Sequence, residues 1–503
     1  MQISKKKASI LNIIFAMVNQ VVVVIYGFFI PNMILNTFGA QLHGYTSTVN
    51  TVMNYINLLS AGIAPVAVQV LYEPLVKKDR LKLNQVLNAI DRFYAKIGFW
   101  YIVAISISAT ILPLCTSSQI PSYEAFGLMI AIGLTNTLDC FIYSKYRTLL
   151  QADQRMFVIS WVDTIANIFR FIFQFILIKL RYDLIVVMIV PTILLIFRAM
   201  VLSLYCKKYY TSLDKKVEPD YSSLSQRRAV LLQNIAWLVT CSTDVIILTL
   251  AGNLVQVSIY SVYNMICTQI YSVIAIFPSS LLASFGQLIS EGRYKKVIDT
   301  YNIFEGVFMS ILAFMYSVTA SMILPFISIY TAHQTNIKYV DSILAILFIT
   351  NELIRYLKIP ADTIVSAKGH FEQIKWSSVA EAIINLVISL ALLKPLGVYG
   401  LLIGSICSNI YRTIYIIAYT NKKILYIPLK QTIMRVFRVA LTIVINAYIY
   451  KELFNLYVMK NWMQWIMYSA VTSIISGMIV LAVTLIFEYK IINKVIKNKS
   501  MSL

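Results

Sequence analysis

The sequence predicts an all-α integral membrane protein with about fourteen transmembrane helices. Three observations lead to this fold class: an apolar composition, long apolar runs along the whole chain, and basic residues concentrated in alternate loops. Hydrophobic residues make up 59% of the 503 residues and charged residues only 13%. Soluble proteins have about 25% charged residues, so this composition suits a bilayer rather than water as solvent.

Fourteen stretches are long enough to cross a bilayer, which requires about 20 mostly apolar residues. They are residues 10–35, 43–71, 89–113, 122–143, 156–179, 184–206, 229–251, 258–285, 300–325, 338–359, 374–393, 397–420, 432–455 and 462–488. The first run continues far beyond the length of a signal-peptide core and has no small-residue cleavage site. We therefore interpret it as a retained first span.

The basic residues of the loops test these spans independently, because cytoplasmic loops hold the excess of Lys and Arg. When the N-terminus and every second loop are assigned to one side, that side holds 32 Lys and Arg and the other holds 6. Both termini are therefore predicted to be cytoplasmic. This asymmetry also explains the net charge of +21, and no RNA-binding motif indicates a nucleic-acid partner.

The two halves of the chain resemble each other at an offset of 213–215 residues. The matched pairs include Gly39 with Gly252, Pro65 with Pro278, Asp139 with Glu352, Lys145 with Lys358, Trp161 with Trp376 and Arg198 with Arg412. Six spans repeat, and six is an even number, so the two halves are predicted to be parallel. In parallel repeats the substrate path lies between the halves.

This repeat predicts the domain organisation. An N-terminal six-helix bundle covers residues 1–206, and a basic cytoplasmic linker covers 207–228. A second six-helix bundle covers 229–421. Residues 422–503 add two further transmembrane helices and a basic cytoplasmic tail.

Charged and amide side chains inside the spans are candidate site residues, since a charge at the bilayer centre costs about 2.5–3.5 kcal/mol. In the fifth span, polar residues step by three or four and share one helical face. The expected substrate-binding residues are Arg170, Arg198, Arg412, Lys96, Asn167, Gln174 and Asn409. The expected ion-coupling carboxylates are Asp244, Asp163, Glu381 and Glu352. A cationic cavity suits an anionic group such as phosphate, which guanidinium binds bidentately.

The alternative is a structural role, in which these charges form ion pairs and amide contacts between helices. Asp163 with Arg170 and Glu352 with Arg355 are the candidate pairs. The six cysteines form no CxxC motif and are interpreted as small core residues. No Walker loop, nucleophile elbow or paired Cys/His ligands occur in the sequence. We therefore expect no enzymatic activity, no metal site and no cofactor.

Three stretches resemble the Wzx-type polysaccharide flippases of the MOP (MATE-like) superfamily. They are residues 146–160, residues 241–266 with Thr243–Asp244 and Tyr260–Ser261, and residues 366–406 with Lys368–Gly369–His370–Phe371, Asn385, Gly397 and Gly400. The resemblance implies a MOP-like fold in the bacterial plasma membrane. It also implies the substrate, an undecaprenyl-pyrophosphate-linked oligosaccharide that is moved across the membrane for O-antigen, capsule or exopolysaccharide synthesis.

Further partners that follow from this interpretation are membrane lipid, H⁺ or Na⁺ as a coupling ion, and a polysaccharide polymerase with co-export proteins. Two alternatives stay open. A MATE-type cation-coupled multidrug or metabolite exporter has the same superfamily fold, but acidic residues are expected to dominate its cavity. A membrane-embedded glycosyltransferase or polymerase needs large outer loops with catalytic carboxylates, whereas the predicted outer loops here are short.

Overall fold

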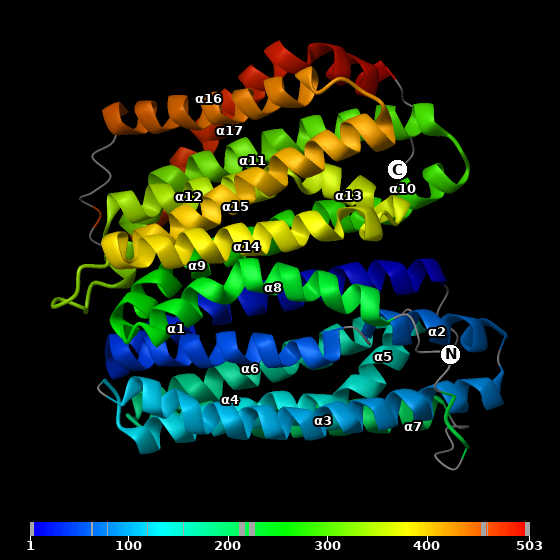
Figure 1. Cartoon of the computed structure of the whole chain (residues 1–503), viewed down its shortest axis with the longest axis vertical. Helices are drawn as coiled ribbons and strands as arrows, with labels where there is room; N and C mark the ends of the chain where they lie inside the picture. The colour runs from blue at the N-terminus through cyan, green and yellow to red at the C-terminus, as the bar shows by residue number, and fades with distance from the viewer. Residues whose placement is uncertain are drawn as a thin grey trace. The chain divides into compact units, whose positions relative to one another are not determined.

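The computed structural model (Figure 1) describes residues 5–61, 64–77, 79–117, 119–153, 155–210, 217–220, 227–453, 459 and 461–497. All regular secondary structure in these residues is helical, which confirms the predicted all-α class. Packing divides the chain into two compact units, Met1–Ser261 and Val262–Leu503.

The first unit contains eight α-helices, one π-helix and the start of a ninth α-helix. They are α1 (Lys5–Ala61), α2 (Ala64–Lys77), α3 (Arg80–Thr116), α4 (Ser122–Leu138), the π-helix η1 (Asp139–Tyr143), α5 (Ser144–Ala152), α6 (Met156–Lys179), α7 (Leu184–Tyr209), α8 (Arg227–Leu250) and α9 (Leu254–Ile274). Within α1 the helical backbone is interrupted at Gly39, where φ is 89°. Glycine tolerates this positive φ because it has no Cβ atom. The first two predicted spans therefore meet at Gly39.

The core of the first unit is apolar and is built mainly from α1, α3, α4 and α7. Figure 1 shows α3, α4 and α7 side by side. Part of the predicted linker also packs on this unit: Lys82 of α3 pairs with Asp220 at 2.6 Å, and the Asn88 amide donates to the Val217 carbonyl at 2.8 Å. The linker residues 211–216 and 221–226 lie outside the described residues.

The second unit contains the end of α9 and the remaining helices. They are α10 (Ile276–Ser290), α11 (Tyr294–Tyr330), α12 (Ser342–Leu357), α13 (Ile359–Lys368), α14 (Phe371–Leu396), α15 (Val398–Tyr419), the π-helix η3 (Thr420–Leu425), α16 (Lys430–Leu453) and α17 (Trp462–Lys497). The long helix α11 packs against α12, α16 and α17, and α14 packs along α15.

Nine helices among the described residues are long and apolar enough to cross a membrane, so the chain is a multi-pass membrane protein. Some of the other predicted spans coincide with interrupted helices. The span predicted at 122–143 is α4 continued by η1, and the span predicted at 258–285 is divided between α9 and α10. The number of fourteen spans stays a prediction.

The boundary between the compact units lies after Ser261, whereas the repeat predicts a boundary within residues 207–228. The reason is that α8 packs on α1. The Oγ1 atoms of Thr48 and Thr249 are 2.7 Å apart, and the hydroxyl groups of Tyr55 and Thr243 are 2.9 Å apart. The boundary at residues 207–228 divides the two sequence repeats and stays a prediction, whereas the boundary after Ser261 divides the two compact units.

The contact between α14 and α15 depends on two glycines of α15, Gly400 and Gly404, which form a small-xxx-small pattern. A Cβ atom on Gly404 would lie 2.8 Å from the Ser389 backbone nitrogen, and one on Gly400 would lie 2.7 Å from the Leu392 carbonyl carbon. Both approaches are shorter than a van der Waals contact and involve backbone atoms, which cannot rotate away.

We expect Gly404→Ala to destabilise the purified protein by about 1–3 kcal/mol, as overpacking does. Gly477→Ala is the matched control, because Gly477 also lies inside a helix but its nearest neighbour would be 3.8 Å from the new Cβ. The measurement is the melting temperature in detergent, read by fluorescence size-exclusion chromatography. Equal melting temperatures for the two variants would show that the helices do not depend on this close approach.

Candidate functional site

The polar face predicted on the fifth span belongs to α6, and it packs against α1, α7 and η1. Asp163 accepts hydrogen bonds from the Tyr143 hydroxyl at 2.7 Å and from Arg198 of α7 at 3.1 Å. The possible pair of Asp163 with Arg170 is therefore wrong. Arg170 lies seven positions after Asp163 on the same helix, a rise of about 10 Å, whereas Arg198 comes from the adjacent helix.

Arg170 lies over the ring of Tyr26 from α1, with 4.3 Å between the guanidinium carbon and the ring centroid. This cation–π contact holds the side chain without neutralising its charge. Among the described residues no carboxylate forms an ion pair with Arg170. Gln174 accepts from the Tyr26 hydroxyl at 2.8 Å and donates to the Val187 carbonyl at 3.0 Å. It thus fixes Tyr26, and through that ring it positions Arg170.

Asn167 and Lys96 have different surroundings. The amide of Asn167 donates to Asn19 of α1 at 3.4 Å, so this residue lies in the contact of α6 with α1. Lys96 lies on an exposed face of α3 together with Phe99 and Trp100. Arg92, one turn before Lys96, is exposed on the same face, so the structure does not place Lys96 with the polar face of α6.

In the second unit, Glu381 of α14 lies between two cations. The ammonium of Lys358 is 3.0 Å from one carboxylate oxygen, and Nε of Arg412 is 3.5 Å from the other. Arg412 also donates to the Ser377 hydroxyl and, at 3.3 Å, to the Ile374 carbonyl. Both Glu381 and Arg412 are buried. The structure thus compensates the Glu381 charge locally.

Glu352 and Asn409 belong to a second buried polar chain of this unit. Glu352 pairs with Arg355 at 2.9 Å, as the structural alternative proposed. The Asn351 amide donates to Glu352 at 3.0 Å, and the Asn409 amide donates to Asn351 at 2.9 Å. This chain connects α12 with α15. Like Glu381, Glu352 has its charge compensated by a neighbouring cation.

Asp244 is a buried carboxylate of α8 that accepts a hydrogen bond from Tyr260 of α9 at 3.0 Å. The neighbouring Thr243 contacts Tyr55 of α1. Asp244 therefore lies where α8 meets α1 and α9. Thr240, one turn before Asp244 on α8, is also buried.

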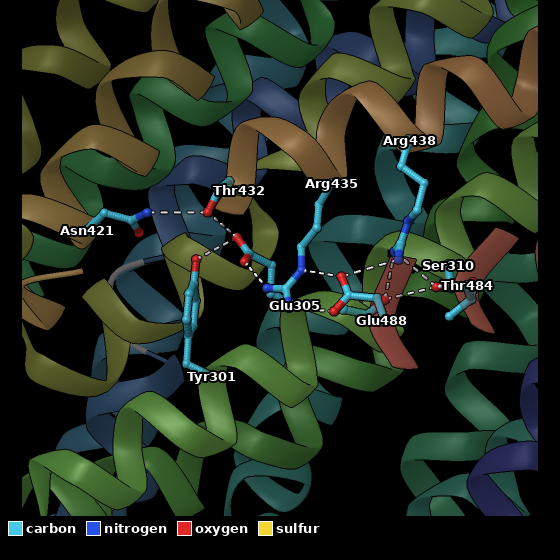
Figure 2. Close-up of polar contacts among 10 residues, drawn as sticks. Tyr301, Glu305, Ser310, Asn421, Thr432, Arg435, Arg438, Thr484 and Glu488 are labelled. Carbon is cyan, nitrogen blue, oxygen red and sulfur yellow. Dashed lines mark hydrogen bonds and ion pairs between the residues drawn. The ribbon is translucent and has the colours of Figure 1, made fainter. Parts of the chain in front are cut away.

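A buried ion-pair network that was not predicted from the sequence connects α11, α16 and α17 (Figure 2). Arg435 pairs with Glu305 and, at 2.7 Å, with Glu488, and Arg438 lies 3.2 Å from the same Glu488. None of these four residues is among the candidate site residues predicted from the sequence. The signal was present, because Arg435 and Arg438 fall inside the predicted span 432–455 and Glu305 falls inside 300–325.

No protein-family model and no curated protein matches the sequence. Solved structures do match. The lipid II flippase MurJ in its inward closed conformation has a TM-score of 0.66 and 15% sequence identity, and the match covers 96% of this chain and 100% of that chain. An inward-facing multidrug resistance MATE transporter of the MOP superfamily has a TM-score of 0.61 and 12% identity, with 86% of this chain and 99% of that chain covered.

A mutant of the Vibrio cholerae MATE transporter VcmN has a TM-score of 0.57 and 12% identity, and 83% of this chain and 99% of that chain are covered. These matches confirm the predicted MOP-like fold class. The structural neighbours are flippases and transporters rather than enzymes.

Proposed function

We propose that this protein is a flippase that moves undecaprenyl-pyrophosphate-linked oligosaccharide units across the bacterial plasma membrane by alternating access. The observation that supports this most is the extent of the likeness to the lipid II flippase, which leaves only 4% of this chain uncovered. The two C-terminal helices α16 and α17 are together longer than the uncovered 4% of the chain, so the likeness to the lipid II flippase includes at least part of them. The likeness to the two MATE transporters covers 86% and 83% of the chain.

The charges of the described residues favour an anionic substrate over an organic cation. Glu381 and Glu352 are neutralised by cations of their own unit, so they are poor candidates for attracting a cationic drug. Arg170 is held by a ring instead of a carboxylate and keeps its charge for a pyrophosphate. A MATE-type cation-coupled exporter remains the second candidate, because the same fold serves both kinds of protein.

Ion coupling is part of this proposal. Asp244 is our first candidate for carrying H⁺ or Na⁺, because it is a buried carboxylate at the contact of three helices. Asp163 is the second candidate, and it already pairs with Arg198. We also propose that both termini are cytoplasmic, and that the units are delivered to a polymerase in O-antigen, capsule or exopolysaccharide synthesis.

We expect Arg170→Ala to lower the flipping rate about tenfold or more, which corresponds to the loss of one charge-assisted contact. The assay is the translocation of a labelled polyprenyl-pyrophosphate oligosaccharide in proteoliposomes. Arg170→Lys keeps the charge but not the bidentate geometry, so it should give an intermediate rate. Lys179→Ala is the matched control, because Lys179 is an exposed cation on the same helix.

A wild-type rate for Arg170→Ala would rule out this residue as a substrate contact. Arg412→Ala is a weaker test of the same idea, since that change also removes one of the two cations beside Glu381 and the donor to the Ser377 hydroxyl. A loss of activity in Arg412→Ala has to be accompanied by a wild-type melting temperature before it counts as an effect on the substrate.

A further inference from the structure

The first unit contains a polar cavity of about 330 Å³ that is lined by residues of α1, α3, α4, η1 and α5. Its size is at the lower end of small-molecule sites, which span about 300–1,000 Å³. Each lining residue carries a hydrogen-bonding group. Three of them are the carboxamides Asn57, Asn136 and Gln151. None of these three is among the predicted site residues.

The lining also contains aromatic and charged residues. Tyr94 and Tyr101 contribute rings, and Asp139 and Arg147 contribute one charge of each sign. The hydroxyl group of Tyr101 donates to the side-chain oxygen Oδ1 of Asn57 at 2.8 Å. Hydrogen bonds of Tyr101 with Asn57 and with Ser60 thus connect the lining residues of α1 to α3.

The π-helix η1 connects this cavity with the polar face of α6. π-helical turns insert one extra residue into a helix and occur frequently at functional sites. The first residue of η1, Asp139, lines the cavity, and the last, Tyr143, donates to Asp163 at 2.7 Å. Asp163 in turn pairs with Arg198. The five-residue helix η1 therefore contributes one residue to the cavity lining and another to a hydrogen bond with a predicted site residue.

The chemistry of the lining limits the ligand. The carboxylate of Asp139 disfavours an anion, and the guanidinium of Arg147 disfavours a metal cation. A lipid chain offers no hydrogen bonds to this lining, in which every side chain carries a polar group. A neutral ring with several hydroxyl groups satisfies the donors and the acceptors together, and its apolar faces can contact Tyr94 and Tyr101.

We propose that this cavity binds one sugar ring of the transported glycan. This inference rests on the proposed function, because the lipid-linked oligosaccharide is the source of the sugar. The carboxamides and the Asp139–Arg147 pair of charges bind ring hydroxyl groups, and the tyrosine rings contact the sugar faces. The cavity thereby holds the glycan, while Arg170, which lies over the Tyr26 ring, remains for the pyrophosphate.

The test uses saturation-transfer NMR on the full-length protein in lipid nanodiscs. The probes are methyl α-glucopyranoside, methyl β-galactopyranoside and N-acetylglucosamine at millimolar concentration, with empty nanodiscs as background. We expect at least one sugar to bind the wild type, and Asn136→Leu to weaken its binding about tenfold. Thr135→Val is the matched control: Thr135 precedes Asn136 on α4 but contacts Thr192 of α7 at 2.7 Å. Gln151→Met replaces Asn136→Leu if the latter does not fold.

Two results would overturn the inference: no sugar signal above empty nanodiscs, or equal affinities for the cavity variant and Thr135→Val. Flipping of the labelled polyprenyl-pyrophosphate oligosaccharide is measured on the same wild-type preparation. Flipping without sugar binding contradicts the cavity assignment alone. Absence of flipping contradicts the proposed function, whatever the NMR experiment gives.

Discussion

Replacing Arg435 with methionine is expected to destabilise the protein by about 3–5 kcal/mol, the usual effect of removing one partner from a buried ion pair. Arg435 is 2% exposed, and so is Glu305. Without the guanidinium, the remaining donors to Glu305 within the described residues are the hydroxyl groups of Tyr301, at 3.0 Å, and of Thr432, at 2.9 Å. Two neutral hydrogen bonds do not compensate a buried carboxylate charge.

The charges of the network sum to zero, because it contains two arginines and two glutamates, which come from three helices (Figure 2). Arg435 connects Glu305 of α11 with Glu488 of α17, and Arg438 contacts the second of these carboxylates. The network therefore holds the C-terminal helices α16 and α17 to α11. Loss of Arg435 should loosen both helices before the rest of the second unit unfolds.

A double variant distinguishes this charge effect from lost packing. Arg435→Met with Glu305→Leu removes one charge of each sign and leaves the Arg438–Glu488 pair, so it should recover most of the lost stability. Lys375→Met is the control, since Lys375 forms an exposed pair with Glu372 and exposed pairs contribute about 0–1 kcal/mol. The measurement is the melting temperature of the wild type, Arg435→Met, the double variant and Lys375→Met. A double variant as unstable as Arg435→Met would show that the stability lost in Arg435→Met does not come from the unpaired charge of Glu305.

The sequence was sufficient to predict the fold class, because long apolar runs have few solutions in a bilayer other than helices. It also predicted the polar face of α6, since a spacing of three or four residues defines a helical face without knowledge of any neighbour. The predicted spans 156–179 and 184–206 agree closely with α6 and α7. These are local properties of one segment.

The partners of the buried charges were harder to predict, because they come from distant segments. Asp163 pairs with Arg198, 35 positions away, and Arg435 pairs with Glu305, 130 positions away. Only Glu352 and Arg355, three positions apart on one helix, were paired correctly from the sequence. The cavity beside Asp139 was missed for the same reason, since α1, α3, α4 and α5 all contribute to its lining.

A disulfide between α1 and α8 is expected to stop transport. The hydroxyl oxygens of Thr48 and Thr249 are 2.7 Å apart and both residues are buried, so cysteines at these positions can approach to bonding distance. Nearby, a Cβ atom on Gly44 would lie 3.0 Å from the Leu254 carbonyl carbon, and the His43 ring is 2.8 Å from Ser258. This seam joins α1 of the first predicted half to α8 and α9 of the second.

Alternating access requires the two repeats to rock against each other, so the seam has to open in each cycle. In a background without the native cysteines, oxidation of Thr48→Cys/Thr249→Cys should reduce flipping to background, and reduction should restore it. Thr135→Cys/Thr192→Cys is the matched control: its hydroxyl groups are also 2.7 Å apart, but both helices belong to the first predicted half. Continued flipping by the Thr48/Thr249 variant, with the disulfide verified by mass spectrometry, would exclude opening of this seam from the cycle.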